Sequence, residues 1–110
     1  MDEVKFYSSG LQEIKIDPET QSTYWVVKSK NLMFTYFEVL PNKTFASHSH
    51  ESEQMTYVLE GKLFFDIDKK VYCVASGDLI SIPSFKEHSV WTNAEGAKAV
   101  DSWSPVNNRY

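Results

Sequence analysis

Short hydrophobic segments separated by turn signals run through most of the chain. Two of the clearest, residues 24–28 and 32–40, are rich in the aromatic and β-branched side chains that suit a pleated, half-buried surface. Segments of the same kind follow at residues 55–60, 62–68, 71–75, 79–82, 88–92 and 97–103. No stretch repeats its apolar residues convincingly with the period of a helix. The pattern therefore predicts an all-β fold of short strands, a sandwich or a barrel.

Glycine, proline and asparagine mark the predicted turns. Pro41 and Asn42 follow the second long segment, and asparagine tolerates the left-handed backbone that a tight turn requires. Gly61 separates two segments, which predicts a hairpin around that glycine. Pro83 ends a later segment because it cannot donate a ladder hydrogen bond. Further turns are expected at residues 69–70 and 76–78.

The size and charge of the chain narrow its class. A chain of 110 residues has room for a single domain, residues 1–110. The net charge is −4 and no basic run is present, so nucleic acid is not an expected partner. No apolar run approaches the roughly 20 residues that span a bilayer, so no membrane partner is expected. The start of the chain lacks a signal-peptide pattern, which predicts a cytoplasmic protein.

Two features outside the strand pattern also carry expectations. The single Cys73 cannot form an intramolecular disulfide, and its apolar surroundings indicate a small core or strand residue. Residues 1–20 carry Leu11, Ile14 and Ile16, which could form an edge strand or an arm that crosses to a partner subunit. We therefore expect a homodimer.

The three histidines of the chain suggest a metal site. His48 and His50 are two residues apart, so on a strand they would point to the same face and could converge on one ion. Gln54 keeps the same parity if a strand resumes there, and His88 follows Pro83 on a segment that could close the site from across a barrel. One divalent transition metal would account for all three histidines; Ni, Zn, Fe, Mn, Co and Cu all remain open.

The spacing of these residues resembles the two motifs of the cupin family. Residues 42–61 match the first motif, with Asn42, His48, His50, Gln54 and Gly61 at its marked positions. Residues 77–93 contain the second, with Gly77, Pro83, Phe85 and His88 at its marked positions. The resemblance implies a cupin barrel, a jelly-roll-like double-stranded β-helix, with a metal bound by His48, His50, Gln54 and His88.

Three positions depart from the family pattern. Asn42 and Phe85 stand where the motifs have glycine, so the turn at Phe85 is expected to differ and its ring to border the pocket mouth. Gln54 stands where the usual ligand is a carboxylate, which would leave the charge of the ion uncompensated and favour anionic ligands. Glu51 or Glu53 could ligate instead, but parity and motif spacing favour Gln54.

A second resemblance concerns the end of the chain. Residues 53–61 and 101–110 look like those of small cupins that linearise unsaturated uronates in pectin and alginate breakdown. That resemblance implies that Asp101 is an acid/base group, that Trp103 is an aromatic wall and that Arg109 meets the substrate carboxylate, although Arg109 lies two residues later than the usual spacing. An ordinary polar strand residue is the alternative for Asp101. Trp103, Phe85 and Thr56 are expected to line the substrate pocket.

Three functions remain open on the sequence alone. The first is an enzyme that opens or tautomerises the ring of a small unsaturated uronate, with the metal holding the anion and Asp101 moving protons. The second is a non-haem metal dioxygenase, against which the neutral Gln54 counts. The third is a non-catalytic, metal-dependent barrel that binds sugars or acids.

Overall fold

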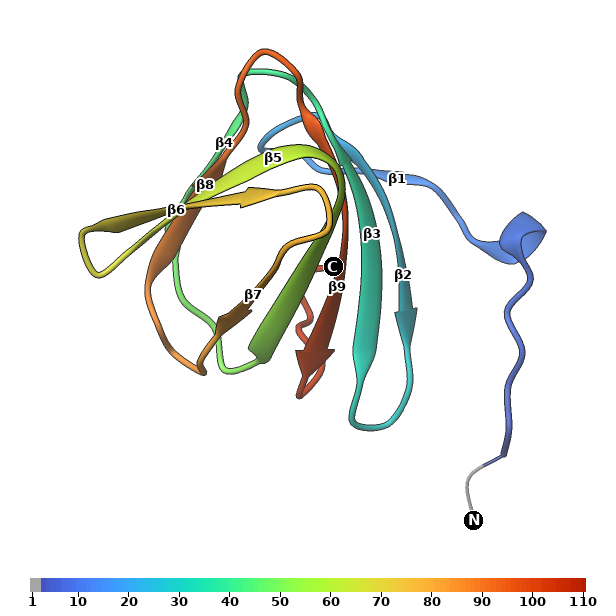
Figure 1. Ribbon diagram of the computed structural model, residues 1–110. Helices are drawn as coiled ribbons and strands as arrows, with labels where there is room; N and C mark the ends of the chain where they lie inside the picture. The colour runs from blue at the N-terminus through green and yellow to red at the C-terminus, as the bar shows by residue number, and fades with distance from the viewer. Residues whose placement is uncertain (1–2) are drawn as a thin grey trace.

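A computed structural model describes residues 3–110, which form an all-β domain (Figure 1). This confirms the predicted fold class. A 3-10 turn, η1 (Ser9–Leu11), precedes nine strands: β1 (Lys15–Ile16), β2 (Thr23–Lys28), β3 (Met33–Val39), β4 (Thr44–His48), β5 (Glu53–Ile67), β6 (Lys70–Ala75), β7 (Leu79–Ile82), β8 (His88–Trp91) and β9 (Ala97–Ser104). Within the described residues, no helix is long and apolar enough to cross a membrane.

The strands form one curled antiparallel sheet in the order β1-β2-β3-β9-β5-β8-β4. Strand β5 is its centre, because its first half pairs with β9 and β7 and its second half pairs with β6 and β8. The curl folds the sheet over itself, so that β3 and β9 lie opposite β4 and β8 around the interior (Figure 1). Side chains that alternate toward this interior form the core.

The hairpin expected at Gly61 is wrong, because β5 runs without a break from Glu53 to Ile67. The register with β9 shifts between Val58 and Glu60, and such an irregularity bends a strand. Gly61 has φ +72°, and a Cβ built there would lie 2.2 Å from the carbonyl oxygen of Gly96. Glycine is required by this close approach of two backbones, a demand that sequence alone does not distinguish from a turn.

The other turn predictions fare better. Asn42 adopts φ 55°, the left-handed conformation expected of it. Asp68 and Lys69 have φ 54° and 63°, so they form the two-residue turn that joins β5 to β6. Cys73 lies on β6 as a strand residue, but its side chain is exposed and does not belong to the core.

The first part of the chain forms the edge strand that was one of the two expectations for residues 1–20. Lys15 and Ile16 form the edge strand β1 on β2. Residues 3–14 lead away from the barrel as an arm (Figure 1). Ile14 and Ile16 are exposed, and the side chain of Leu11 lies outside the described residues.

Candidate metal centre

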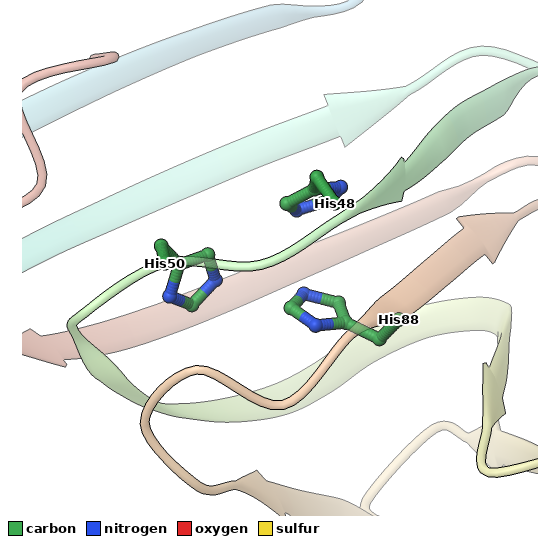
Figure 2. Close-up of side chains that lie close together, drawn as sticks. All are labelled: His48, His50 and His88. Atoms are coloured by element: carbon green, nitrogen blue, oxygen red, sulfur yellow. The ribbon is translucent and has the colours of Figure 1, made fainter.

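Three different parts of the chain bring the histidines together. His48 is the last residue of β4 and His88 is the first residue of β8, and the two are paired in register. His50 lies beyond β4, in the loop that leads to β5, so loop geometry and not strand alternation turns it toward the other two. One ring nitrogen from each of the three lies within 4.8 Å of the others (Figure 2).

Backbone carbonyls orient all three rings in the same way. The Nδ1 atoms of His48, His50 and His88 lie 2.7, 2.8 and 2.8 Å from the carbonyl oxygens of Ala46, Ser52 and Lys86. A carbonyl oxygen only accepts, so each Nδ1 carries the proton and donates it. In a neutral ring this leaves the lone pair on Nε2, the arrangement found in metal-ligating histidines.

Gln54 adds an oxygen to this group of nitrogens. Its side-chain amide nitrogen donates to the Thr56 hydroxyl at 2.9 Å and to the Asp101 carboxylate at 3.3 Å, which fixes its direction. Its oxygen Oε1 therefore faces Nε2 of His50, at 3.1 Å. Both atoms present lone pairs, so a cation bound between these residues would relieve their repulsion. Three imidazole nitrogens and an amide oxygen are a donor set that fits a divalent transition metal.

Burial keeps two of the histidines in the neutral form that binds metals. It is the largest influence on His88, whose pKa falls to about 4, and the neighbouring His48 and His50 lower that pKa further. Burial also lowers the pKa of His48, helped by the positive charge of Arg109. Neutral ligands at physiological pH avoid competition between protons and a metal ion.

Asp101 is buried next to this cluster and accepts hydrogen bonds from three side chains. The hydroxyls of Thr56 and Thr35 donate to its two carboxylate oxygens, and the Gln54 amide gives the third bond. Thr35 in turn accepts a hydrogen bond from Trp103 Nε1 at 2.9 Å. Burial raises the pKa of the Asp101 carboxyl, and the three hydrogen bonds oppose this rise. The result is one hydrogen-bonded network from Trp103 through Thr35 and Asp101 to Gln54, whose oxygen faces His50.

A cavity of about 50 Å³ opens beside these groups. That volume exceeds the roughly 10–15 Å³ that one water requires, so it suits an ion with a few waters or the end of a small ligand. Trp103 and Thr56, two of the residues expected at the substrate pocket, line this cavity. Its other lining residues are Phe37, Val39, Phe45, His48, Gln54, Leu63, Phe65, His88, Val90, Ala99, Asp101 and Tyr110.

Tyr110 is a cavity residue that the sequence reasoning missed. Its ring packs 5.3 Å from that of Phe37, 5.4 Å from that of Tyr24 and 5.6 Å from that of Trp103. The segment after β9 folds back to place it there, and Lys28 donates to its carbonyl oxygen at 2.6 Å. No local pattern in the last residues predicts this return.

Phe85 and Arg109, which were expected at the substrate pocket, lie outside the cavity lining. The side chain of Phe85 is 69% exposed. Its φ of 62° is left-handed, the conformation that the glycine of the motif would adopt easily, so φ does not show the difference that was expected for this turn. Arg109 pairs with Glu19 at 2.7 Å, and Glu19 also accepts the backbone N–H of Ala46. Arg109 thus anchors the end of the chain near β4. The alternative ligands Glu51 and Glu53 are exposed.

Comparison with known proteins places this arrangement in a family. The family model described as Cupin domain matches residues 35–102, which span most of the strands and all three histidines. The chain is a cupin. No curated protein sequence matches it.

Solved structures share the cupin fold of this chain at low sequence identity. KdgF from Halomonas sp. has a TM-score of 0.84 at 18% identity, over 97% of this chain and 98% of that one. An RmlC-like cupin from Shewanella frigidimarina has a TM-score of 0.84 at 20% identity, over 97% and 96%. A structure of Bacillus subtilis oxalate decarboxylase, from a study of the Mn(II) centres of that enzyme, has a TM-score of 0.83 at 19% identity. This cupin covers 33% of that longer chain. These likenesses establish the fold alone, because one fold hosts many activities.

Proposed function

We propose that this cupin binds one divalent transition metal through His48, His50, His88 and Gln54, and opens or tautomerises the ring of a small unsaturated uronate. The observation that carries the proposal is the position of Gln54, whose oxygen lies 3.1 Å from Nε2 of His50 while its amide nitrogen donates to Asp101. Gln54, a candidate metal ligand, thus contacts a buried carboxyl group, and both residues line the cavity. The likeness of residues 53–61 and 101–110 to uronate-linearising cupins supports the choice of substrate class.

The neutral donor set favours an anionic ligand. Three uncharged imidazoles and an amide would leave the charge of a divalent ion uncompensated, and the ion would attract a carboxylate and polarise an oxygen bound to it. The exposed side chains of Glu51 and Glu53 do not offset that charge inside the cavity. A cavity of about 50 Å³ accepts the carboxylate end of a ligand while the rest extends toward its mouth.

Asp101 is the proposed acid/base group. Its carboxyl lines the cavity and is shielded from bulk solvent, and burial moves its pKa upward, toward the pH at which acid/base catalysis is effective. The hydroxyls of Thr35 and Thr56 hold its two oxygens in fixed directions. A proton accepted at either oxygen would stay close to a ligand in the cavity.

The test begins with metal content and then turns to chemistry. Protein purified without chelator or metal-affinity resin is expected to hold about one divalent ion per chain by elemental analysis. The metal-loaded protein is then mixed with a 4,5-unsaturated monouronate, and NMR should record loss of the cyclic form. Asp101→Asn is expected to bind the uronate but turn it over about a hundredfold more slowly, the usual size of an acid/base contribution.

Matched controls separate the parts of this proposal. Asp66→Asn changes a carboxylate on β5 that does not line the cavity, so it should leave turnover unchanged. Normal turnover by Asp101→Asn would reduce Asp101 to a structural residue. Binding of small acids without consumption of any uronate would favour the non-catalytic binding protein, and protein free of metal would reject the site itself.

A further inference from the structure

The segment that follows β9, residues 105–110, folds back into the barrel and brings Tyr110 to the cavity (Figure 1). We call this segment the strap. Among the described residues that line the cavity, only His48 and Tyr110 are partly exposed, and the others are buried. These two side chains therefore mark the mouth of the cavity, and the ring of Tyr110 lies across the path by which a ligand would enter.

The start of the strap is fixed, whereas its remainder has no backbone hydrogen bonds to the domain. The hydroxyl of Ser52, a buried residue, donates to the carbonyl oxygen of Pro105 at 2.6 Å, directly after β9. Within the described part of the chain, no backbone-to-backbone hydrogen bond joins the strap to another segment. Segments held by few contacts open at a low free energy while the rest of the fold stays closed. Pro105 is thus the fixed end about which residues 106–110 can move.

Two cationic side chains hold the far end of the strap. Lys28 Nζ donates to the carbonyl oxygen of Tyr110 at 2.6 Å, in an exposed contact. Arg109 pairs with Glu19 at 2.7 Å, and the two side chains are 40% and 28% exposed. Ion pairs this accessible stabilise a structure only weakly, because water and salt screen them. These anchors can therefore release the far end of the strap without any change in the sheet.

The cavity is too small to enclose a ring-shaped ligand while Tyr110 is in place. Its volume is about 50 Å³, whereas sites that enclose small molecules usually measure about 300–1,000 Å³. The carboxylate end of a ligand fits this volume, but Tyr110 lies where the rest of that ligand would extend. The ring of Tyr110 packs against Tyr24, Phe37 and Trp103, so its withdrawal would open an aromatic-lined space the size of one six-membered ring.

We propose that the strap is a gate whose plug is Tyr110: residues 106–110 swing out to admit a cyclic carboxylate, and the ring of the ligand takes the place of the Tyr110 ring. For the class of ligand this inference rests on the proposed function, whereas the movement of the strap does not depend on it. A ligand that binds only the open form has its affinity reduced by the fraction of molecules that are open. A small acid that fits the closed cavity is not affected, so loosening the strap should favour cyclic acids selectively.

The ratio of benzoate affinity to acetate affinity tests the gate. Isothermal titration of the full chain loaded with Zn²⁺ measures both affinities, and the ratio cancels any change in charge around the ion because both probes are monoanions. Arg109→Gln breaks the ion pair with Glu19 and should raise the ratio up to about fivefold, the upper range for an exposed pair. Arg109→Lys keeps a cation there and should retain the wild-type ratio.

Lys98→Gln is the matched control. Lys98 is 43% exposed and pairs with Glu38 and Glu60, on β3 and β5, so this variant breaks similar ion pairs that do not touch the strap. The ratio should stay at its wild-type value. Loss of both anchors of the strap, in Lys28→Met combined with Arg109→Gln, should raise the ratio about tenfold.

A neutral probe separates the gate from the metal centre. p-Cresol has the shape of a tyrosine side chain and no carboxylate, so it can be titrated into the metal-free protein. The double variant Lys28→Met, Arg109→Gln should bind p-cresol about tenfold more tightly than the wild type does. In the p-cresol complex, the NMR contacts between the rings of Tyr110 and Phe37 should disappear, because the probe has displaced the plug.

The outcomes distinguish failure of the gate from failure of the proposed function. Equal p-cresol affinity in the double variant and the wild type would overturn the gate, as would persistent contacts between Tyr110 and Phe37 in the p-cresol complex. A benzoate-to-acetate ratio raised equally by Lys98→Gln and Arg109→Gln would overturn it too. Absence of acetate binding to the Zn²⁺-loaded wild type would instead reject the anion site of the proposed function, and the p-cresol result would still decide the gate. Far-UV circular dichroism checks that each variant is folded.

Discussion

Two neighbouring layers of the barrel interior lie on the same three strands, but one layer is apolar and the other is polar. In one layer, Phe37, Ala99 and Val58 lie side by side on β3, β9 and β5, and all three are apolar core residues. Two residues along each strand, Thr35, Asp101 and Thr56 occupy the equivalent inward positions. The backbone is common to both layers, so their difference resides entirely in the side chains.

The polar layer is tolerated because its hydrogen bonds are complete. Among the described residues, no buried side-chain nitrogen or oxygen lacks a hydrogen-bond partner. Unsatisfied, each such group would cost about 1–3 kcal/mol. A β-barrel can therefore gain a site when polar residues that satisfy each other's hydrogen bonds replace apolar inward residues. The adjacent apolar layer then supplies the stability.

The largest effect on stability is expected when a buried side chain of the apolar core is removed. Phe65→Ala removes a fully buried ring of the core and should lower the free energy of unfolding by about 3–5 kcal/mol. Urea denaturation measures this loss. Phe64→Ala is the matched control, because Phe64 is the preceding residue of β5 and stacks on Trp91 on the opposite face. Equal losses in the two variants would contradict the assigned faces.

A substitution in the metal centre should weaken metal binding without unfolding the protein. His88→Ala removes one candidate ligand and should weaken metal binding by at least about a hundredfold, since even the groups that orient a ligand are worth 10–100-fold. Isothermal titration with Zn²⁺ of chelator-treated protein measures the affinity. Glu51→Gln, an exposed acid in the loop beside His50, is the control and should bind normally. A loss of affinity in Glu51→Gln alone would instead make that carboxylate the ligand.

The stability of the metal-free protein should also depend on pH, because His88 is buried in its neutral form. The folded pKa of His88 is about 4, below its ordinary 6.5, so the unfolded chain binds more protons between these pH values. Stability is therefore fully present above about pH 6.5 and decreases as the pH falls toward 4. For metal-free protein, this group alone should cost about 2 kcal/mol between pH 7 and pH 5.

Urea denaturation of wild type and His88→Gln at both pH values checks this, because the variant removes the titrating group. The difference in unfolding free energy between pH 7 and pH 5 should be about 2 kcal/mol smaller in the variant. An identical pH dependence in the two proteins would show that His88 does not resist protonation in the fold.

Local pattern in the sequence is enough to predict most strands and to single out two members of the polar layer, Asp101 and Thr56, but it gives no sign of Thr35. Alternation alone places Ala99, Asp101 and Trp103 on one face of β9, and all three are buried there. The motif spacing selects the three histidines that the structure brings within 4.8 Å. Periodicity and motif spacing are read from the order of residues along the chain, so no knowledge of tertiary contacts is required.

The errors arise where distant segments decide the outcome. Gly61 is required by the backbone of Gly96, which is remote in sequence, so a local interpretation favoured a hairpin. The position of Tyr110 depends on a return of the chain after β9, and Arg109 pairs with Glu19 near the other end of the chain. His50 reaches the cluster through a loop, although strand alternation predicted the same outcome for a different reason.

The smallest predicted effect concerns the charge of the polar layer. Gln54→Glu replaces the neutral oxygen near His50 with a carboxylate, which would cancel one unit of the metal's charge. In the metal-loaded protein, acetate binding should weaken about tenfold while metal affinity rises. The variant also removes the amide that donates to Asp101, so the two carboxyls should share a proton at lower pH and acetate binding should weaken more as the pH rises. Glu53→Gln changes the net charge by one unit at an exposed neighbouring position and should leave acetate binding unchanged. Equal acetate affinity in Gln54→Glu and the wild type would mean that Gln54 does not set the charge at the ion, and the preference of the site for anions would then need another origin.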